Sequence, residues 1–273
     1  MAGRPVRARR DCSSAANGAR QLGPGDGLRV EVFGQLVEAH ARSGGRFVRL
    51  GDLVPVVRRL TDRVVKLTLR AAAHAGKPSH CGARCAGCAA CCRYLVPLSA
   101  PEAFALARDL AALPAGRRKQ LQAACRAASR RVLEAVRRLP PADGDAAAWR
   151  SYAELRIDCP FLVAGRCAIY DRRPLACRTY HVVSDPAYCL RGGAAGSERL
   201  AMPFSPVQAL CRLAAELEGS PPQAVLLALA PDWAAGNAER AGRRYPLRSA
   251  LRRLEEIIRE RVAALTDAAQ QAA

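Results

Sequence analysis

The chain has 273 residues, half of them apolar, which is enough to bury the core of one large domain or two ordinary ones. Its formal net charge of +19 is mostly arginine, since only three of the 43 basic residues are lysines. In a chain that is also rich in alanine and glycine, this excess of arginine indicates the nucleotide composition of the coding sequence rather than a function in binding. The few aromatic residues are not interleaved with the basic runs. The composition therefore excludes a base-stacking surface and predicts nucleic-acid binding that is weak and non-specific at most.

Twelve cysteines without an export signal favour a reducing compartment. The basic residues 1–10 are not followed by the apolar stretch of a secretory signal, and no apolar run is long enough to span a bilayer. We therefore expect a cytoplasmic protein with no membrane partner. Because thiols stay reduced in the cytosol, the cysteines favour metal binding, with a disulfide framework as the alternative that an even count allows.

The start of the chain predicts a disordered basic arm followed by a helical segment. Residues 1–29 contain arginine, glycine, serine and proline with almost no large apolar side chains, so burial cannot offset the entropy cost of ordering them. Residues 30–79 form the predicted helical segment, and we expect its helix to end at Gly76. Its apolar stripe consists of Leu53, Val57, Leu60, Val64, Leu67 and Ala71.

Two further helices are predicted between the cysteine clusters. Ser99 and Glu102 have the spacing of a capping box with proline in the first turn, so a helix begins there and ends at Pro114. A longer helix follows over residues 121–139, and its apolar stripe includes Cys125, which we interpret as a buried core thiol. The arginines around its other side form a solvated surface or, alternatively, an anion-binding face.

The rest of the chain predicts turns and helices. Residues 140–145 form a loop, Gly165 lies in a tight turn, and Pro174 opens a helical turn. Apolar residues at helical spacing follow from Pro206 to Leu217, and again at Val225, Leu226 and Leu229. The last helix has its stripe at Leu251, Leu254, Ile258, Val262 and Leu265. Its charged side carries the predicted ion pairs Arg252 with Glu256 and Glu255 with Arg259, and it packs on its own domain or binds a partner.

Two cysteine clusters carry the chemistry. The first spans residues 80–92 and the second residues 158–189. A metal held by four thiolates at about 2.3 Å needs sulfur atoms that lie close together, and one Cys-x-x-Cys turn supplies two of them. The remaining ligands must come from elsewhere in the fold, so we interpret the two clusters as halves of one site.

The number and spacing of the thiols leave the type of centre open. Cys91 and Cys92 are consecutive and point in different directions, so either one faces the core or they serve different centres. The set is large enough for two four-thiolate sites, or for one iron–sulfur cluster with spare thiols. A third cysteine at the same interval resembles the run that holds clusters in bacterial ferredoxins and favours iron over zinc. The set consists of Cys85, Cys88, Cys91, Cys92, Cys159, Cys167, Cys177 and Cys189.

Charged and polar residues next to the cysteines are the remaining candidates. Arginines one residue from a cluster cysteine would offset the negative charge of a thiolate centre. They are Arg84, Arg93, Arg166 and Arg178. Further candidate ligands or proton carriers, each more often a surface or hydrogen-bonding residue, are Asp158, Asp171, Tyr170, His80 and His181.

The ordered string of motifs resembles the YkgJ-type cysteine-cluster family. The shared motifs are Cys-x-x-Cys-x-x-Cys-Cys from Cys85, Val96-Pro97-Leu98-Ser99, Cys159-Pro160-Phe161-Leu162, Gly165-x-Cys167-x-Ile169-Tyr170, and Arg173-Pro174-x-x-Cys177-Arg178. The family is described as a zinc- or iron-chelating domain with eight cysteines, and the flagellin lysine N-methylase is among its relatives. The resemblance spans about residues 80–190, implies that the eight cysteines listed above are the metal ligands, and leaves Cys81 as an addition to the pattern.

Together these observations predict a mostly α-helical protein whose cysteine-rich loops converge on a metal centre. We expect an N-terminal helical segment (30–79), a metal-binding domain (80–190) and a C-terminal helical segment packed on it (191–273). The function is an iron–sulfur or zinc protein of unknown reaction, and the resemblance adds possible support of methyl transfer. The alternative is a non-catalytic zinc-stapled module that binds an acidic protein or nucleic acid. No motif beyond the cysteines identifies an enzyme or a substrate.

Overall fold

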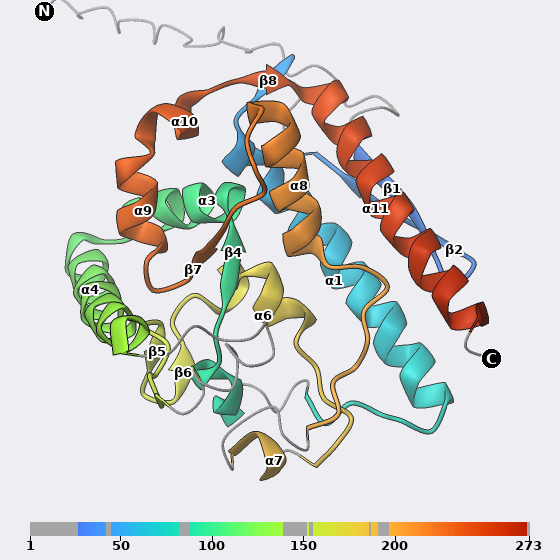
Figure 1. Cartoon of the computed structure of the whole chain (residues 1–273), viewed down its shortest axis with the longest axis horizontal. Coiled ribbons are helices and arrows are strands. Elements are labelled where there is room, and N and C mark those ends of the chain that lie inside the picture. Colours follow the sequence, from blue (N-terminus) through green and yellow to red (C-terminus); the bar gives the residue numbers. More distant parts are fainter. Residues whose placement is uncertain are drawn as a thin grey trace, which may run out of the picture.

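Helices dominate the fold, which confirms the predicted mostly α class (Figure 1). The computed structural model describes residues 27–41, 45–81, 88–138, 152, 155–185, 187–190 and 197–271. Residues 1–26, the loop at 140–145, Cys12 and Cys85 lie outside these ranges. The α-helices are α1 (Leu50–His74), α3 (Ala100–Ala111), α4 (Ala115–Arg138), α6 (Leu175–Thr179), α7 (Ala187–Leu190), α8 (Pro206–Glu218), α9 (Ala230–Gly236), α10 (Ala238–Gly242) and α11 (Leu247–Gln271).

Short antiparallel strand pairs connect the helices. Within the described ranges they form four two-stranded sheets, β1–β2, β3–β8, β4–β7 and β5–β6. The strands are β1 (Gly27–Val32), β2 (Gln35–His40), β3 (Phe47–Val48), β4 (Pro97–Ser99), β5 (Leu162–Val163), β6 (Arg166–Cys167), β7 (Ala224–Leu226) and β8 (Tyr245–Pro246). There are also two short 3-10 helices: η1 (Ala90–Arg93) contains Cys91 and Cys92, and η2 (Tyr170–Arg172) lies between Cys167 and Cys177.

The first described element is a β-hairpin, so the prediction of helix from Val30 is wrong for residues 30–40. The predicted arm overlaps β1 at residues 27–29. Val30 and Val32 are buried while Glu31 between them is exposed, which is the period of two of a strand. Phe33 and Gly34 both have positive φ, as a two-residue hairpin turn of type I′ requires.

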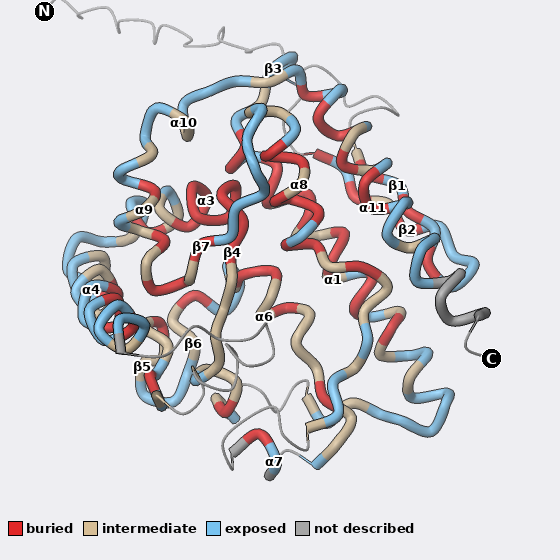
Figure 2. Tube along the Cα trace, viewed as in Figure 1, coloured by how far each residue is buried: buried red, intermediate tan, exposed pale blue. Residues whose placement is uncertain are grey.

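Helix α1 is the central helix, and its predicted apolar stripe is buried from Leu53 to Val64 (Figure 2). Leu67 is half-buried, and Ala71 is exposed, so the stripe ends one turn earlier than predicted. The predicted end at Gly76, which has a positive φ, is confirmed. Its first turn fits closely against α3, because a Cβ on Gly51 would lie 3.2 Å from the backbone nitrogen of Ala105. Pro55 cannot donate to the Gly51 carbonyl one turn earlier. Arg108 of α3 donates to that carbonyl instead, at 3.4 Å, and also pairs with Asp52.

The largest hydrophobic core combines segments from both ends of the chain. Buried side chains of β1, β2 and α1 pack with those of α8 and α11, and Leu175 of α6 joins them. Helix α11 therefore packs on its own chain, with Glu255 paired to Arg259 as predicted, whereas Glu256 pairs with Arg253. The division into three segments stays a prediction, and this core draws residues from each of them.

A second core lies under the cysteine segments. It contains Leu106 and Leu110 of α3, Leu121 and Cys125 of α4, and the fully buried Phe161. Cys125 is 2% exposed, which confirms a buried core thiol. The sheet β4–β7 borders this core, and it corrects the interpretation of Val225 and Leu226 as helical: they form a strand, because they pair with a segment about 127 residues earlier that local periodicity cannot reveal.

Candidate metal centre

The backbones of the two cysteine clusters are joined directly. The N–H of Cys159 donates to the carbonyl of Cys92 at 2.7 Å. The flanking residues Arg93 and Asp158 form an ion pair at 2.8 Å. Segments that are 67 residues apart in sequence are therefore neighbours in the fold.

Two further contacts hold the first cluster to the end of the second. The hydroxyl of Tyr94 donates to the carbonyl of Cys189 at 3.1 Å. At the other side, the N–H of Val182 donates to the sulfur of Cys81 at 3.4 Å. Cys189 is buried and packs with Ala90 and Val182, so it lies at the edge of the same region.

Local sequence explains how Cys167 and Cys177 are presented. Ala164 and Gly165 have φ of 49° and 73°, which makes the predicted tight turn a two-residue β5–β6 hairpin with Cys167 at its end. Pro174 lies just before α6, as predicted, and this single helical turn carries Cys177.

Four thiols, one from the first cluster and three from the second, lie within electrostatic reach of one another. Burial raises the pKa of Cys177 well above its usual range, and Cys159, Cys91 and Cys167 raise it further. Burial also raises the pKa of Cys159 to about 12, with smaller contributions from Cys167, Cys125 and Cys91. Because such effects weaken with distance, Cys91, Cys159, Cys167 and Cys177 face a common region.

These raised pKa values describe thiols without a cation. A buried thiolate is costly on its own, and a bound metal ion lowers the pKa of a coordinating thiol until it ionises. Thiolates are the soft donors that zinc and iron–sulfur clusters use. The chemistry of these residues therefore fits either group.

The described thiols do not lie close enough together to coordinate one metal ion. Within the described ranges, no three His, Cys, Asp or Glu side chains are grouped tightly enough to hold a metal ion. Cys85 lies outside these ranges, and Cys88 is exposed. No two of the ten described cysteines form a disulfide with each other. Of the consecutive pair, Cys91 contributes to the raised pKa of Cys177 in the second cluster. The backbone carbonyl of Cys92 accepts the hydrogen bond from the N–H of Cys159.

The arginine next to Cys177 binds other protein groups. Nη1 of Arg178 donates to both carboxylate oxygens of Asp62 on α1, at 2.7 and 2.8 Å. Its other nitrogens donate to the carbonyls of Asp171 and Arg173. Arg178 therefore anchors the second cluster to α1, and no sequence signal pointed to Asp62 as its partner.

The other candidates have varied environments. His80, Asp158, Tyr170 and Asp171 are exposed. His181 is partly buried, with Nε2 3.1 Å from the carbonyl of Arg178, and its Nδ1 has no hydrogen-bond partner among the described residues. Burial lowers the pKa of His181, which favours the neutral ring.

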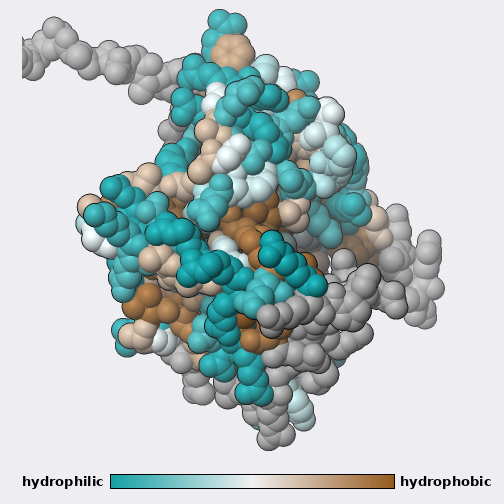
Figure 3. Space-filling view, turned by 60° about the vertical axis from the view of Figure 1, so that its left-hand side comes forward, coloured by the Kyte–Doolittle hydropathy of each residue, from teal (hydrophilic) through white to brown (hydrophobic). Residues whose placement is uncertain are grey.

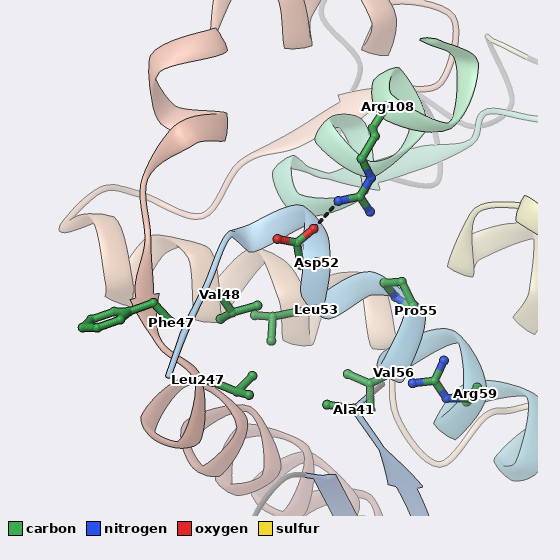
Figure 4. A pocket seen from close by; sticks show the side chains of 10 residues that line it. All are labelled: Ala41, Phe47, Val48, Asp52, Leu53, Pro55, Val56, Arg59, Arg108 and Leu247. Carbon is green, nitrogen blue, oxygen red and sulfur yellow. Dashed lines mark hydrogen bonds and ion pairs between the residues drawn. The ribbon is translucent and has the colours of Figure 1, made fainter. Parts of the chain in front are cut away.

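Two cavities differ in their relation to the cysteines. One, of about 490 Å³, lies between α1, β3 and the start of α11. The ion pair of Asp52 with Arg108 forms part of its wall (Figure 4). The other, of about 500 Å³, is lined by Cys91 and Cys177. Sequence reasoning missed this cavity, because its wall combines β4, β7, α6 and α8.

The fold and the thiols define a mostly helical protein with a cysteine-rich region, whose thiols are of the kind that can coordinate a metal ion. Residues 84–191, about two fifths of the chain, match the model of the CxxCxxCC family, described as a "putative zinc- or iron-chelating domain". This match confirms the resemblance of that segment to a cysteine-cluster family. No curated protein and no solved structure gives a significant match. In the part of the chain that the structure describes, no helix has the length and hydropathy needed to cross a bilayer.

Proposed function

We propose that the two cysteine clusters chelate zinc or an iron–sulfur cluster in one shared centre. The observation that carries this proposal is the hydrogen bond from Cys159 to Cys92, which holds the backbones of the two clusters together. After burial, the thiols of Cys159 and Cys91 contribute to the raised pKa of Cys177, which supports the proposal because these thiols come from both clusters.

The remaining members of the proposed ligand set are Cys85, Cys88, Cys92 and Cys189. The family match includes all eight positions. Closing the centre requires the described thiols to move to about 2.3 Å from a common ion or cluster. Since buried thiols must lose their protons to bind, metal uptake releases protons and stabilises the folded protein.

Metal analysis of anaerobically purified full-length protein tests this proposal. Brown protein with iron and sulfide identifies a cluster, and colourless protein with stoichiometric zinc identifies a zinc site. Cys88→Ser and Cys177→Ser should each lose metal and lower the melting temperature, because both remove a ligand from the same centre. If Cys177→Ser retains all metal while Cys88→Ser loses it, the clusters act independently and the shared centre is refuted.

A further inference from the structure

A third cavity lies where α1 faces the second cysteine cluster. Its volume is about 340 Å³, at the lower end of the roughly 300–1,000 Å³ that small-molecule sites occupy. Its wall combines the first half of α1 with residues 170–178, and α1 and α6 lie side by side near the centre of Figure 1. Half of its lining residues are arginines, whereas the walls of the other two cavities are mostly apolar.

Two of the four lining arginines are occupied by protein groups. Nη1 of Arg178 holds both carboxylate oxygens of Asp62, as described above. Nη2 of Arg59 donates to a backbone carbonyl at 2.6 Å. The other two lining arginines, Arg58 and Arg173, have far fewer contacts with acceptors, and a ligand would have to pair with them.

The guanidinium of Arg58 is buried but weakly paired. Its side chain is 13% exposed, and its Nη1 donates to Asp109 at 3.3 Å. Its Nε is buried and has no hydrogen-bond partner in the described part of the chain. Burial lowers the pKa of Arg58, and the charge of Arg178 lowers it further, against the opposing effect of Asp109. The protein therefore supplies this cation with less anionic compensation than its burial demands.

Arg173 lines the cavity, and no described residue accepts a hydrogen bond from its guanidinium. The guanidinium carbon lies 3.9 Å from the centroid of the Tyr170 ring, which holds the group in place. A ring face attracts the positive charge but is only a weak hydrogen-bond acceptor. The N–H donors of Arg173 are therefore left for an oxygen acceptor in the cavity.

The acidic residues of the wall do not cancel its positive charge. Asp62 is held by Arg178, and Asp171 is exposed. Four arginines against two aspartates leave an excess of positive charge, part of which Asp109 offsets beside Arg58. The remaining excess favours an anion that offers several oxygen acceptors.

We propose that this cavity binds a phosphate group, free or as the monoester of a small molecule, between the guanidinium groups of Arg58 and Arg173. Guanidinium groups form strong charge-assisted hydrogen bonds with phosphate, and their fork of donors matches two of its oxygens at once. A phosphate has enough oxygens for both arginines, and a phosphate monoester carries more negative charge than a carboxylate. The proposal is independent of the proposed metal centre, because none of the lining residues is a cysteine.

The exposed arginines of α4 lack such an enclosure. Helix α4 lies on the side of the molecule that comes forward in Figure 3, where hydrophilic side chains surround smaller apolar patches. Its residues Arg126 and Arg130 are exposed and line none of the three cavities. Anions near them are attracted only by a charge that salt screens. Arg130 is therefore a suitable control for non-specific attraction.

Calorimetric titration of the full-length protein at constant ionic strength tests the proposal. Inorganic phosphate should show saturable binding, and Arg173→Gln should weaken it by about tenfold or more. Asp171→Asn should instead tighten phosphate binding by about threefold, because it removes a negative charge from the wall. Since a loss of folding cannot tighten binding, this variant keeps the test decisive if Arg173→Gln does not fold. Arg130→Gln should leave phosphate binding unchanged.

A parallel titration with glycerol 3-phosphate distinguishes the two sources of the phosphate group. Tighter binding than that of inorganic phosphate identifies a monoester as the ligand, and equal or weaker binding identifies free phosphate. The proposal is overturned if neither compound shows saturable binding, or if a folded Arg173→Gln protein binds phosphate as tightly as the wild type. Unchanged affinity in Asp171→Asn, or equal weakening by Arg130→Gln, also overturns it, because the attraction would then not depend on the charges of the cavity wall.

Discussion

Oε1 of Glu102 accepts a hydrogen bond from the backbone N–H of Leu175 at 2.8 Å. The same carboxylate completes the predicted capping box, since Oε2 accepts from both the N–H and the hydroxyl of Ser99. Glu102 is 1% exposed. One buried carboxylate therefore fixes the start of α3 and the helical turn that carries Cys177.

Glu102→Gln should destabilise the protein by roughly 1–3 kcal/mol. The substitution replaces one accepting carboxylate oxygen with an NH2 group, which is itself a donor and would point at an N–H donor. Chemical denaturation measures the loss. Glu239→Gln is the control, since its side chain is 87% exposed and its pair with Arg243 lies on the surface, so stability should change little. Equal effects of the two variants would contradict a special role for Glu102.

Arg178→Lys should destabilise the fold by roughly 1–3 kcal/mol, because an ammonium cannot reproduce contacts to Asp62 and two carbonyls. The matched control is Arg166→Lys, also one residue from a cysteine but exposed. Denaturation midpoints at equal metal content compare them. If both substitutions are silent, Arg178 is not the anchor described above.

Cys125→Ser and Cys211→Ser should retain full metal, which elemental analysis measures. Cys125 lies among apolar side chains of the second core, so a buried hydroxyl costs roughly 1–3 kcal/mol there. Cys211 already donates to the carbonyl of Gln223, which a serine hydroxyl can also do, so its cost should be smaller. Loss of metal in Cys125→Ser would instead add Cys125, which influences the pKa of Cys159, to the ligand set.

Acid should weaken the contact between α8 and α11. Glu216 is hydrogen-bonded to Arg253 and Arg212, and these contacts lower its pKa. A lowered pKa in the folded state stabilises the protein above the unfolded value of about 4.3, and this contribution disappears as pH falls through the folded pKa. Glu216→Gln should therefore melt below the wild type at pH 7, and the difference should disappear as the pH falls through the folded-state pKa of Glu216.

Exposed Glu31→Gln, which makes the same change of charge on β1, provides the control for that experiment. A melting difference for Glu216→Gln that persists unchanged in acid would mean that packing, and not the ion pairs, accounts for the loss. Added salt should narrow the difference at pH 7, because these groups lie at the surface.

The elements predicted correctly are those whose signals are local. The capping box at Ser99, the helix end at Gly76 and the turn at Gly165 each depend on residues within one turn of chain. The β1–β2 hairpin also has a local signal, the alternation of apolar and polar residues on both sides of Gly34. The predicted helix from Val30 does not use this period of two, so that prediction is wrong there. The strand β7 had no such signal, because its partner lies far away in sequence.

The candidate site divides in the same way. The cysteine spacing predicts a ligand set of eight thiols, which stays a prediction, and all eight lie within the matched residues 84–191. It could not predict that Arg178 would turn to Asp62, or that Arg199 would reach the wall of a cavity with Cys177, because both depend on helix packing over long separations. Proximity of charge in sequence was a poor guide to proximity in space.

The pairing of Phe47-Val48 with Tyr245-Pro246 joins segments almost two hundred residues apart. Contacts of such long sequence separation form late and slow the folding of a chain. During synthesis the cysteines of residues 84–191 leave the ribosome before α8 and α11, which complete the largest core around Leu175. The thiols are thus synthesised before the scaffold that presents them is complete, so the proposed centre would assemble only after the final helix has packed.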